Sequence, residues 1–209
     1  MSVEVKWLGH ASFRVAGAAA VVYIDPWKLK DAPHDADVVV VSHSHHDHMS
    51  AEDVAKVSKD GTAVVAPRAT AGRLAGARSV APGDVVTVND VTIEAVASYN
   101  VAKAFHPKAN NWIGAVILID GKRVYYAGDT DLIPEMSGLK DVDLALLPVG
   151  GTYTMDAAEA ARACQAIGCA AAVPYHWGDI VGSAADAKAF VNSAGCDATL
   201  LQPGESMTL

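Results

Sequence analysis

Four of the eight histidines in this chain stand within six consecutive positions, directly after a short apolar segment. The segment is residues 37–41, and the cluster that follows it contains His43, His45, His46, Asp47 and His48. A rigid strand that ends in such a cluster can bring several side chains to one point. Imidazole nitrogen and carboxylate oxygen are the ligand types of zinc and its neighbours. The chain is therefore expected to fold so that a buried strand presents a metal site at its carboxyl end.

A solvated histidine-rich turn, or the remnant of an affinity tag, is the simpler alternative for this cluster. A tag would lie at a terminus and would not contain an aspartate in this register. We therefore favour the metal site.

Short segments rich in Val and aromatic residues, ending at Gly, Pro, Asp or Ser, predict strands along most of the chain. The predicted strands are 12–15, 21–24, 38–41, 62–66, 85–88, 91–96, 115–119, 123–126, 144–147 and 170–173. The predicted helices are 51–58, 69–76, 156–167 and 184–194. The pair Asp120-Gly121 predicts a hairpin, because both residues tolerate positive φ. Continuous apolar strands combined with hairpins predict an α/β protein with two mixed sheets and outer helices, in one domain over residues 1–209.

Charge and hydropathy exclude several classes of protein. The chain has 16 Lys and Arg against 24 Asp and Glu, a net charge of −8, so it offers no basic surface to a nucleic acid. No apolar run approaches the roughly 18 residues of a membrane-spanning helix, and early charges argue against a signal peptide. We expect a cytoplasmic protein with a small-molecule partner. Its three cysteines, Cys164, Cys169 and Cys196, are expected to be small apolar fillers, with redox sensing as the alternative.

The string His43-x-His45-x-Asp47-His48 resembles the HxHxDH signature of the metallo-β-lactamase superfamily, and three other landmarks stand in the expected order. They are Asp25 in Ile-Asp-Pro, Asp129 in Ala-Gly-Asp-Thr and His176 in Pro-Tyr-His-Trp. The segments Trp7-Leu8-Gly9-His10-Ala11 and Pro203-Gly204-Glu205 are most similar to small metal-dependent hydrolases related to ascorbate-6-phosphate lactonases. The resemblance covers nearly the whole chain. It implies a four-layer αββα sandwich with two mixed β-sheets.

The resemblance also implies a set of ligands for two metal ions. The first ion would take His43 and His45, the second would take Asp47, His48 and His176, and Asp129 would bridge both. A third histidine for the first ion must come from His10, His34, His46 or His106. We choose His106 from its place in chain order. Relatives often have this histidine at a strand end, where this chain has Ser98-Tyr99-Asn100, so the loop 99–111 must fold back for His106 to coordinate; otherwise the first site is open.

Other residues near the motifs have less defined roles. His10 lies either beside the metals, where it would support them or face the substrate, or in a structural hydrogen bond. Asp25 is expected to accept hydrogen bonds from the ligand loop or from a ligand imidazole. His46, at the variable position of the signature, should point away from the metals, and His34 is expected to be solvated in a polar turn. Substrate contacts are expected from Tyr153 and from polar residues around His106, namely Lys103, Lys108, Asn110 and Asn111, although surface lysines and a helix cap explain these nearly as well.

Two adjacent dications imply a hydrolase, because a water shared between them loses a proton near neutral pH and attacks a carbonyl or phosphorus. Asp47 and Asp129 would be the catalytic carboxylates. The substrate is expected to be small and anionic, a phosphorylated sugar lactone or a phosphodiester. Zn²⁺ is the default metal by ligand type, with Mn²⁺, Ni²⁺ and Fe²⁺ as alternatives. The competing functions are an iron-dependent oxygenase of thiols or persulfides and a non-catalytic metal-binding sensor; the oligomeric state is open.

Overall fold

Strand β4 (Ala36–Val40), which precedes the histidine-rich segment, is apolar on both of its faces. Val38 and Val40 belong to a core that lies between two sheets, whereas Val39 belongs to a separate core that includes side chains of α1 (Ala51–Val57). Successive side chains of a strand point to opposite faces, so a strand covered on both sides needs apolar side chains on both of them. The one charged residue of β4, Asp37, is only partly buried and pairs with Lys59. The residues of β4 therefore place it inside the layered structure.

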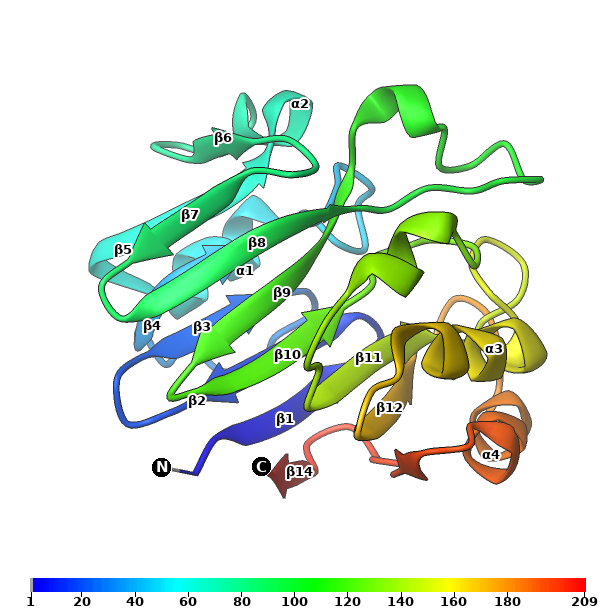
Figure 1. Cartoon of the computed structure of the whole chain (residues 1–209). Coiled ribbons are helices and arrows are strands. Elements are labelled where there is room, and N and C mark those ends of the chain that lie inside the picture. The colour runs from blue at the N-terminus through cyan, green and yellow to red at the C-terminus, as the bar shows by residue number, and fades with distance from the viewer. Residues whose placement is uncertain (1) are drawn as a thin grey trace.

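The computed structural model describes residues 2–209 and contains two seven-stranded sheets that pack face to face (Figure 1). The first sheet has the order β14-β1-β2-β3-β4-β5-β6 and the second has the order β13-β12-β11-β10-β9-β8-β7. The other strands of the first sheet are β14 (Ser206–Thr208), β1 (Glu4–Gly9), β2 (Ser12–Ala16), β3 (Val21–Ile24), β5 (Ser58–Pro67) and β6 (Arg78–Val80). The strands of the second are β13 (Asp197–Ala198), β12 (Ala171–Tyr175), β11 (Leu144–Pro148), β10 (Lys122–Tyr126), β9 (Ile113–Ile119), β8 (Val91–Ala97) and β7 (Val85–Val88).

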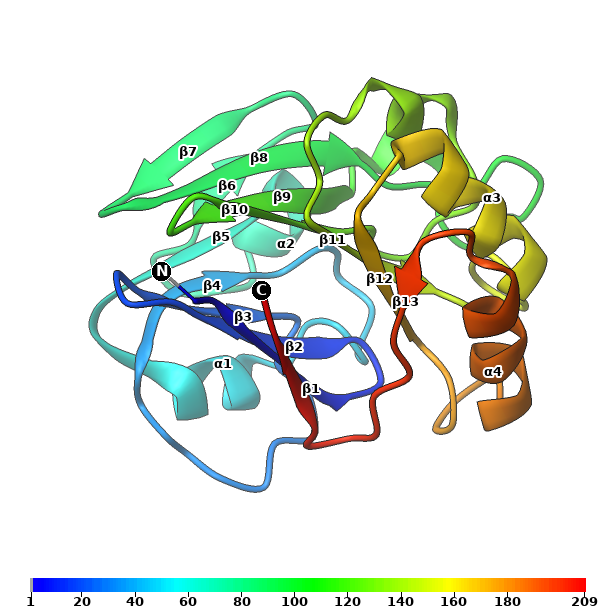
Figure 2. The ribbon, with the colours of Figure 1, turned by 60° about the horizontal axis from the view of Figure 1, so that its bottom comes forward.

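Both sheets are mixed, and helices cover their outer faces (Figure 2). In the first sheet β3, β4, β5 and β6 run parallel, and in the second β10, β11, β12 and β13 do. The remaining helical segments are α2 (Arg68–Ala71), α3 (Ala157–Ile167), α4 (Ala184–Ser193) and the 3₁₀ turns Lys108–Asn110 and Pro134–Gly138. This arrangement confirms the predicted fold class. Within residues 2–209 there is no helix with the length and apolar character needed to cross a membrane.

Most predicted elements are present, and the differences have local reasons. The hairpin between β9 and β10 turns at Asp120 and Gly121, whose φ values are 48° and 78°. The helix predicted at 69–76 is wrong in length, since α2 spans only Arg68–Ala71. Gly72 and Gly76 follow it, and glycine disfavours a helix interior. Strand β1 was not among the predicted strands although its Val5 and Trp7 alternate with less buried neighbours, a period of two that the sequence contains.

Candidate metal centre

The carboxyl ends of four strands bring the predicted ligand segments to one edge of the two sheets. Asp25 directly follows β3, His43 lies just beyond β4, Asp129 just beyond β10, and His176 directly follows β12. Asp25 and His176 adopt positive φ values of 42° and 62°. Residues other than glycine keep this backbone conformation only where their surroundings enforce it, which is common at functional sites.

Ligand atoms of His43, His45 and His106 lie within 4.8 Å of one another, and we call these residues the histidine cluster. The Nε2 of His43 is 3.1 Å from the Nδ1 of His45. His106 reaches them because the loop 99–111 folds back, with the backbone N–H of Asn100 donating to the His106 carbonyl over 2.8 Å. The structure therefore brings together the three histidines that the sequence analysis assigned to the first ion.

A second group, the mixed cluster, consists of His10, Asp47, His48 and His176. The Oδ2 of Asp47 lies 3.7 Å from the Nε2 of His48 and 3.9 Å from the Nε2 of His176. The same oxygen is 3.0 Å from the Nε2 of His10. Of the two roles considered for His10, the geometry favours the place beside the metal ligands, because its buried ring contacts the carboxylate of Asp47.

Asp129 lies between the two clusters. Its Oδ1 is 3.2 Å from the Nε2 of His48, and its Oδ2 is 3.1 Å from the Nε2 of His176. The same Oδ2 is 3.3 Å from the Nε2 of His106, in the histidine cluster. A single carboxylate thus faces one histidine of the first group and two of the second.

Unpartnered polar atoms show that these residues fit a metal group. The Nε2 atoms of His48, His106 and His176 are buried and make no hydrogen bond. The same is true of the Oδ1 of Asp129. Buried polar atoms in native proteins nearly always have a partner, and exceptions call for an explanation such as a bound ion. Imidazole nitrogens and carboxylate oxygens are suitable ligands for a divalent transition metal.

The charges of the buried groups lead to the same conclusion. Burial alone would raise the pKa of Asp129, but the imidazoles of His176 and His48 outweigh it and hold the pKa well below its ordinary value. Burial lowers the pKa of His43 far below its ordinary value and so favours the neutral form that metals bind. Burial opposes charge on His48, yet Asp129 and Asp25 raise its pKa well above the ordinary value. The buried carboxylates therefore require a nearby positive charge, which a metal ion can supply.

Asp25 makes the contacts expected of a residue that orients a ligand. Its fully buried carboxylate lies 2.7 Å from the Nδ1 of His48 and accepts the backbone N–H of Ser42 over 2.7 Å. The hydroxyl of Tyr126 donates to the same carboxylate over 2.7 Å. The hydrogen bond to Nδ1 fixes the ring so that Nε2 faces Asp129.

We expect Asp25→Asn to weaken metal binding by about 10- to 100-fold, the usual effect of losing a partner that orients a ligand. An amide cannot match the charge that holds the His48 imidazole in place. Metal titration by calorimetry on the refolded apoprotein measures the change. Tyr126→Phe is the matched control, because it removes one donor from Asp25 and keeps the contact with His48. Equal affinity in Asp25→Asn and the wild type would contradict the orienting role.

Two residues that shape the histidine cluster, Asn100 and Trp112, were not predicted from the sequence. The Oδ1 of Asn100 lies 2.9 Å from the Nδ1 of His106, and its Nδ2 donates to Asp131 over 3.0 Å. The ring of Trp112 lies 4.9 Å from that of His43, measured between centroids, and also packs on His106. An isolated Asn or Trp in a loop carries no pattern, so only its neighbours in space reveal the role.

Other candidate residues lie outside the clusters. His46 points to solvent with 81% of its side chain exposed, as expected. His34 is exposed, as expected, and its Nδ1 lies 2.8 Å from the backbone carbonyl of Ser58. Lys103 pairs with Asp131, and Lys108 pairs with Glu135. These lysines are therefore engaged in ion pairs rather than presented free to an anionic substrate.

A small cavity of about 160 Å³ opens onto the predicted ligands. His45, Asp47, His106 and Asp129 are part of its lining, and its other walls include Phe105, Tyr153 and Ile180. The rings of Phe105 and Tyr153 pack edge to face with 4.7 Å between centroids. Tyr153 thus lines the same cavity as four of the predicted ligands.

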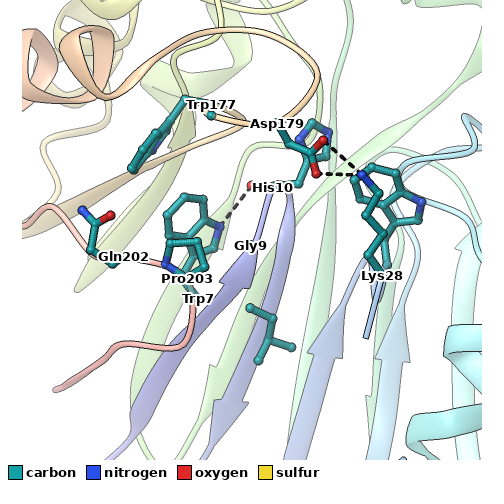
Figure 3. A pocket seen from close by; sticks show the side chains of 11 residues that line it. Trp7, Gly9, His10, Lys28, Trp177, Asp179, Gln202 and Pro203 are labelled. Atoms are coloured by element: carbon teal, nitrogen blue, oxygen red, sulfur yellow. Dashed lines mark hydrogen bonds and ion pairs between the residues drawn. The ribbon is translucent and has the colours of Figure 1, made fainter. Parts of the chain in front are cut away.

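A second cavity, of about 410 Å³, has His10 in its lining (Figure 3). Trp7, Trp177 and the ion pair between Lys28 and Asp179 line it. The Nε1 of Trp7 donates to the His10 carbonyl over 3.0 Å, a contact drawn in the figure. This bond, together with the positive φ of 48° at His10, sets the direction of the His10 side chain toward Asp47.

Two mixed sheets between helices, with histidines and aspartates gathered at the strand ends, define a protein of the metallo-β-lactamase fold with a metal site. Residues 4–176 match the family model of the beta-lactamase superfamily domain. The chain belongs to this superfamily and, within it, to the UPF0173 metal-dependent hydrolases. It is 34% identical to the UPF0173 metal-dependent hydrolase of Korarchaeum cryptofilum, over 99% of this chain and 100% of that protein.

Solved structures extend the comparison. Igni18, a metallo hydrolase from Ignicoccus hospitalis, superposes with a TM-score of 0.80 at 27% identity, over 100% of this chain and 99% of that one. CmlA, a diiron β-hydroxylase from Streptomyces venezuelae, gives a TM-score of 0.78 at 13% identity, over 99% of this chain and 54% of that one. The second likeness concerns the fold alone. The relatives thus place the chain among enzymes of the metal-dependent hydrolase kind.

Proposed function

We propose that the two clusters hold two divalent metal ions with Asp129 shared between them, and that the protein uses them to hydrolyse a small molecule. The histidine cluster would hold the first ion. The second would bind to Asp47, His48 and His176, with His10 fixing the carboxylate of Asp47 by its hydrogen bond. The observation that carries the proposal is the approach of three unpartnered Nε2 atoms to the two oxygens of Asp129.

When bound, such a pair of ions supplies hydroxide at neutral pH and neutralises negative charge that develops on the substrate. The chain's own part is to hold the ligands in place. Asp25 fixes the ring of His48, and Asn100 fixes the ring of His106. No serine or cysteine is among the residues that line the small cavity, so the arrangement supports attack by water rather than by a side chain.

For the substrate we propose a phosphorylated sugar lactone or a phosphodiester, and for the metal Zn²⁺. The similarity of the chain's opening and closing motifs to ascorbate-6-phosphate lactonases supports the lactone. The apolar walls from Phe105 and Ile180 suit the carbon skeleton of such a molecule, whereas its negative charge would be balanced by the metal ions. A screen of lactones, phosphodiesters and thioesters with metal-loaded protein tests this choice. Turnover of thioesters alone would overturn it.

Iron-dependent oxygenation of a thiol or persulfide is the second candidate, because CmlA combines this fold with a diiron site. Fold alone does not decide between the two reactions. Iron in the protein as purified, with oxygen uptake on a thiol substrate, would favour it. A sensor without catalysis is disfavoured, since the predicted ligands all lie in the two clusters or at Asp129.

We expect elemental analysis after gentle purification to find about two divalent ions per chain, one for each cluster. Removing them with a chelator should abolish hydrolysis and lower the Tm, because ions bound only to the folded state stabilise it. Restoring Zn²⁺ should recover both. A protein that stays metal-free after reconstitution would contradict the hydrolase proposal.

A further inference from the structure

We propose that Cys164, Cys169 and Cys196 form a further metal site, separate from the histidine cluster and the mixed cluster. It binds one soft cation, such as Zn²⁺ or Cu⁺, through sulfur. Their three Sγ atoms lie within 4.8 Å of one another. From the sequence these cysteines were expected to be apolar fillers, because they are odd in number and stand in an alanine-rich setting. The fold brings them to one point.

The ends of two neighbouring helices create this arrangement. Cys164 lies in the last turns of α3, and Cys169 directly follows Gly168, which ends α3 with a φ of 68°. Cys196 directly follows Gly195, whose φ is 72°, in the turn after α4. Helices α3 and α4 lie side by side (Figure 2). Glycine adopts this left-handed conformation without strain, so two glycines direct two of the three thiols toward the same space.

The geometry is close to that of a thiolate metal site. A Zn–S bond of about 2.3 Å in tetrahedral coordination places neighbouring sulfurs about 3.8 Å apart. The three Sγ atoms therefore need only a small inward movement to share one ion. Cys164 and Cys169 are 2% and 7% exposed, whereas Cys196 is partly open to solvent and provides the entry. Within residues 2–209 no His, Asp or Glu atom joins the group, so a fourth ligand would be water.

The charge around the group favours a cation over free thiolates. Burial raises the pKa of Cys196, and the neighbouring Cys169 and the carboxylate of Asp197 raise it further, so an unpaired thiolate is disfavoured there. The neighbouring Cys164 lowers the pKa of Cys169 and outweighs the effect of burial, so Cys169 is the thiol that loses its proton first. Each thiol that binds the ion releases its proton to solvent, so the affinity should fall as the pH is lowered. Soft sulfur ligands select Zn²⁺ and Cu⁺ over Mg²⁺ and Ca²⁺.

The site is separate from the candidate hydrolytic centre. Cys169 precedes β12 and His176 follows it, and a strand of 5 residues spans about 16 Å. The two sites share no residue. Loss of metal binding at the three cysteines would therefore leave the proposed hydrolase function unaffected, and the reverse is also true.

Cd²⁺ is the probe for the test, since thiolate binding produces a sulfur-to-cadmium absorption band in the ultraviolet that imidazole and carboxylate ligands do not. The reduced, metal-free full chain is titrated with Cd²⁺. We expect a band that saturates at about one thiolate-bound ion per chain and that Zn²⁺ or Cu⁺ removes by competition. The competing ion that removes the band at the lower concentration is the preferred one.

Cys196→Ser is the main variant, because this residue is the least buried of the three and its replacement is the least disruptive to packing. We expect it to weaken Cd²⁺ binding at least tenfold with an unchanged Tm of the metal-free protein. Asp129→Asn serves as the matched control and should keep the band in full. Absence of the band in a wild-type chain with three titratable thiols would overturn the proposal. A full band in Cys196→Ser, or a disulfide among the three in the protein as purified, would overturn it as well.

Discussion

Replacing Asp129 by asparagine is expected to lower kcat/KM by at least about 10³-fold, because metal-ion catalysis contributes several kcal/mol and each 1.36 kcal/mol is a factor of ten. Asp129 is the carboxylate that faces both clusters, within 3.1 Å of His176 and 3.3 Å of His106. The amide keeps the size of the side chain but loses the negative charge shared by the two ions. The fold should stay intact, which circular dichroism and the Tm of the variant will check.

The control for this substitution must be an aspartate without a structural role. Asp131, only two positions away, is unsuitable: its buried carboxylate holds Asn100 and Lys103 and accepts the backbone N–H of Val101. Asp60 is exposed at the start of β5 and is the better choice. We expect Asp60→Asn to retain wild-type turnover on a substrate found in the screen. Equal activity of the Asp129 and Asp60 variants would require the bridging assignment to be withdrawn.

Replacing His106 by alanine is expected to lower the metal content from about two ions per chain to about one, because the histidine cluster would lose one of its three unshared nitrogens. The mixed cluster keeps its own ligands and should stay occupied. Calorimetric metal titration of the variant should show one site at wild-type affinity and one weakened strongly. Activity should fall with the loss of the first ion.

His46→Ala is the matched control, since His46 belongs to the same loop as the signature histidines but points to solvent. It should bind metal as the wild type does. If His106→Ala also keeps the full complement of metal at wild-type affinity, the ligand role is refuted. A shift in KM or kcat without loss of metal would instead show that the loop 99–111 contacts substrate. His10 would then be the next candidate for the missing nitrogen.

The histidine-rich segment could be recognised as a candidate metal site without the fold because its predicted ligands are close in sequence. His43, His45, Asp47 and His48 follow one buried strand, so their spacing and the strand's end already bring them near one point. The hairpin at Asp120-Gly121 was equally local, since positive φ is a property of the two residues themselves. The helix predicted at 69–76 was too long, although Gly72 and Gly76, which disfavour a helix interior, already mark its end in the sequence.

The sequence by itself determined the strand-rich α/β class, the ligand types and the single loop in which most of them lie, because strand propensity, turn residues and metal preference are properties of short segments. Only the tertiary structure decided which distant residues join them. His106 reaches His43 through a loop held by Asn100, and His10 reaches Asp47 because the end of β1 lies next to the end of β12. The meeting of the three cysteines has the same origin. Contacts between residues far apart in the chain depend on strand order and helix packing, which no local pattern encodes.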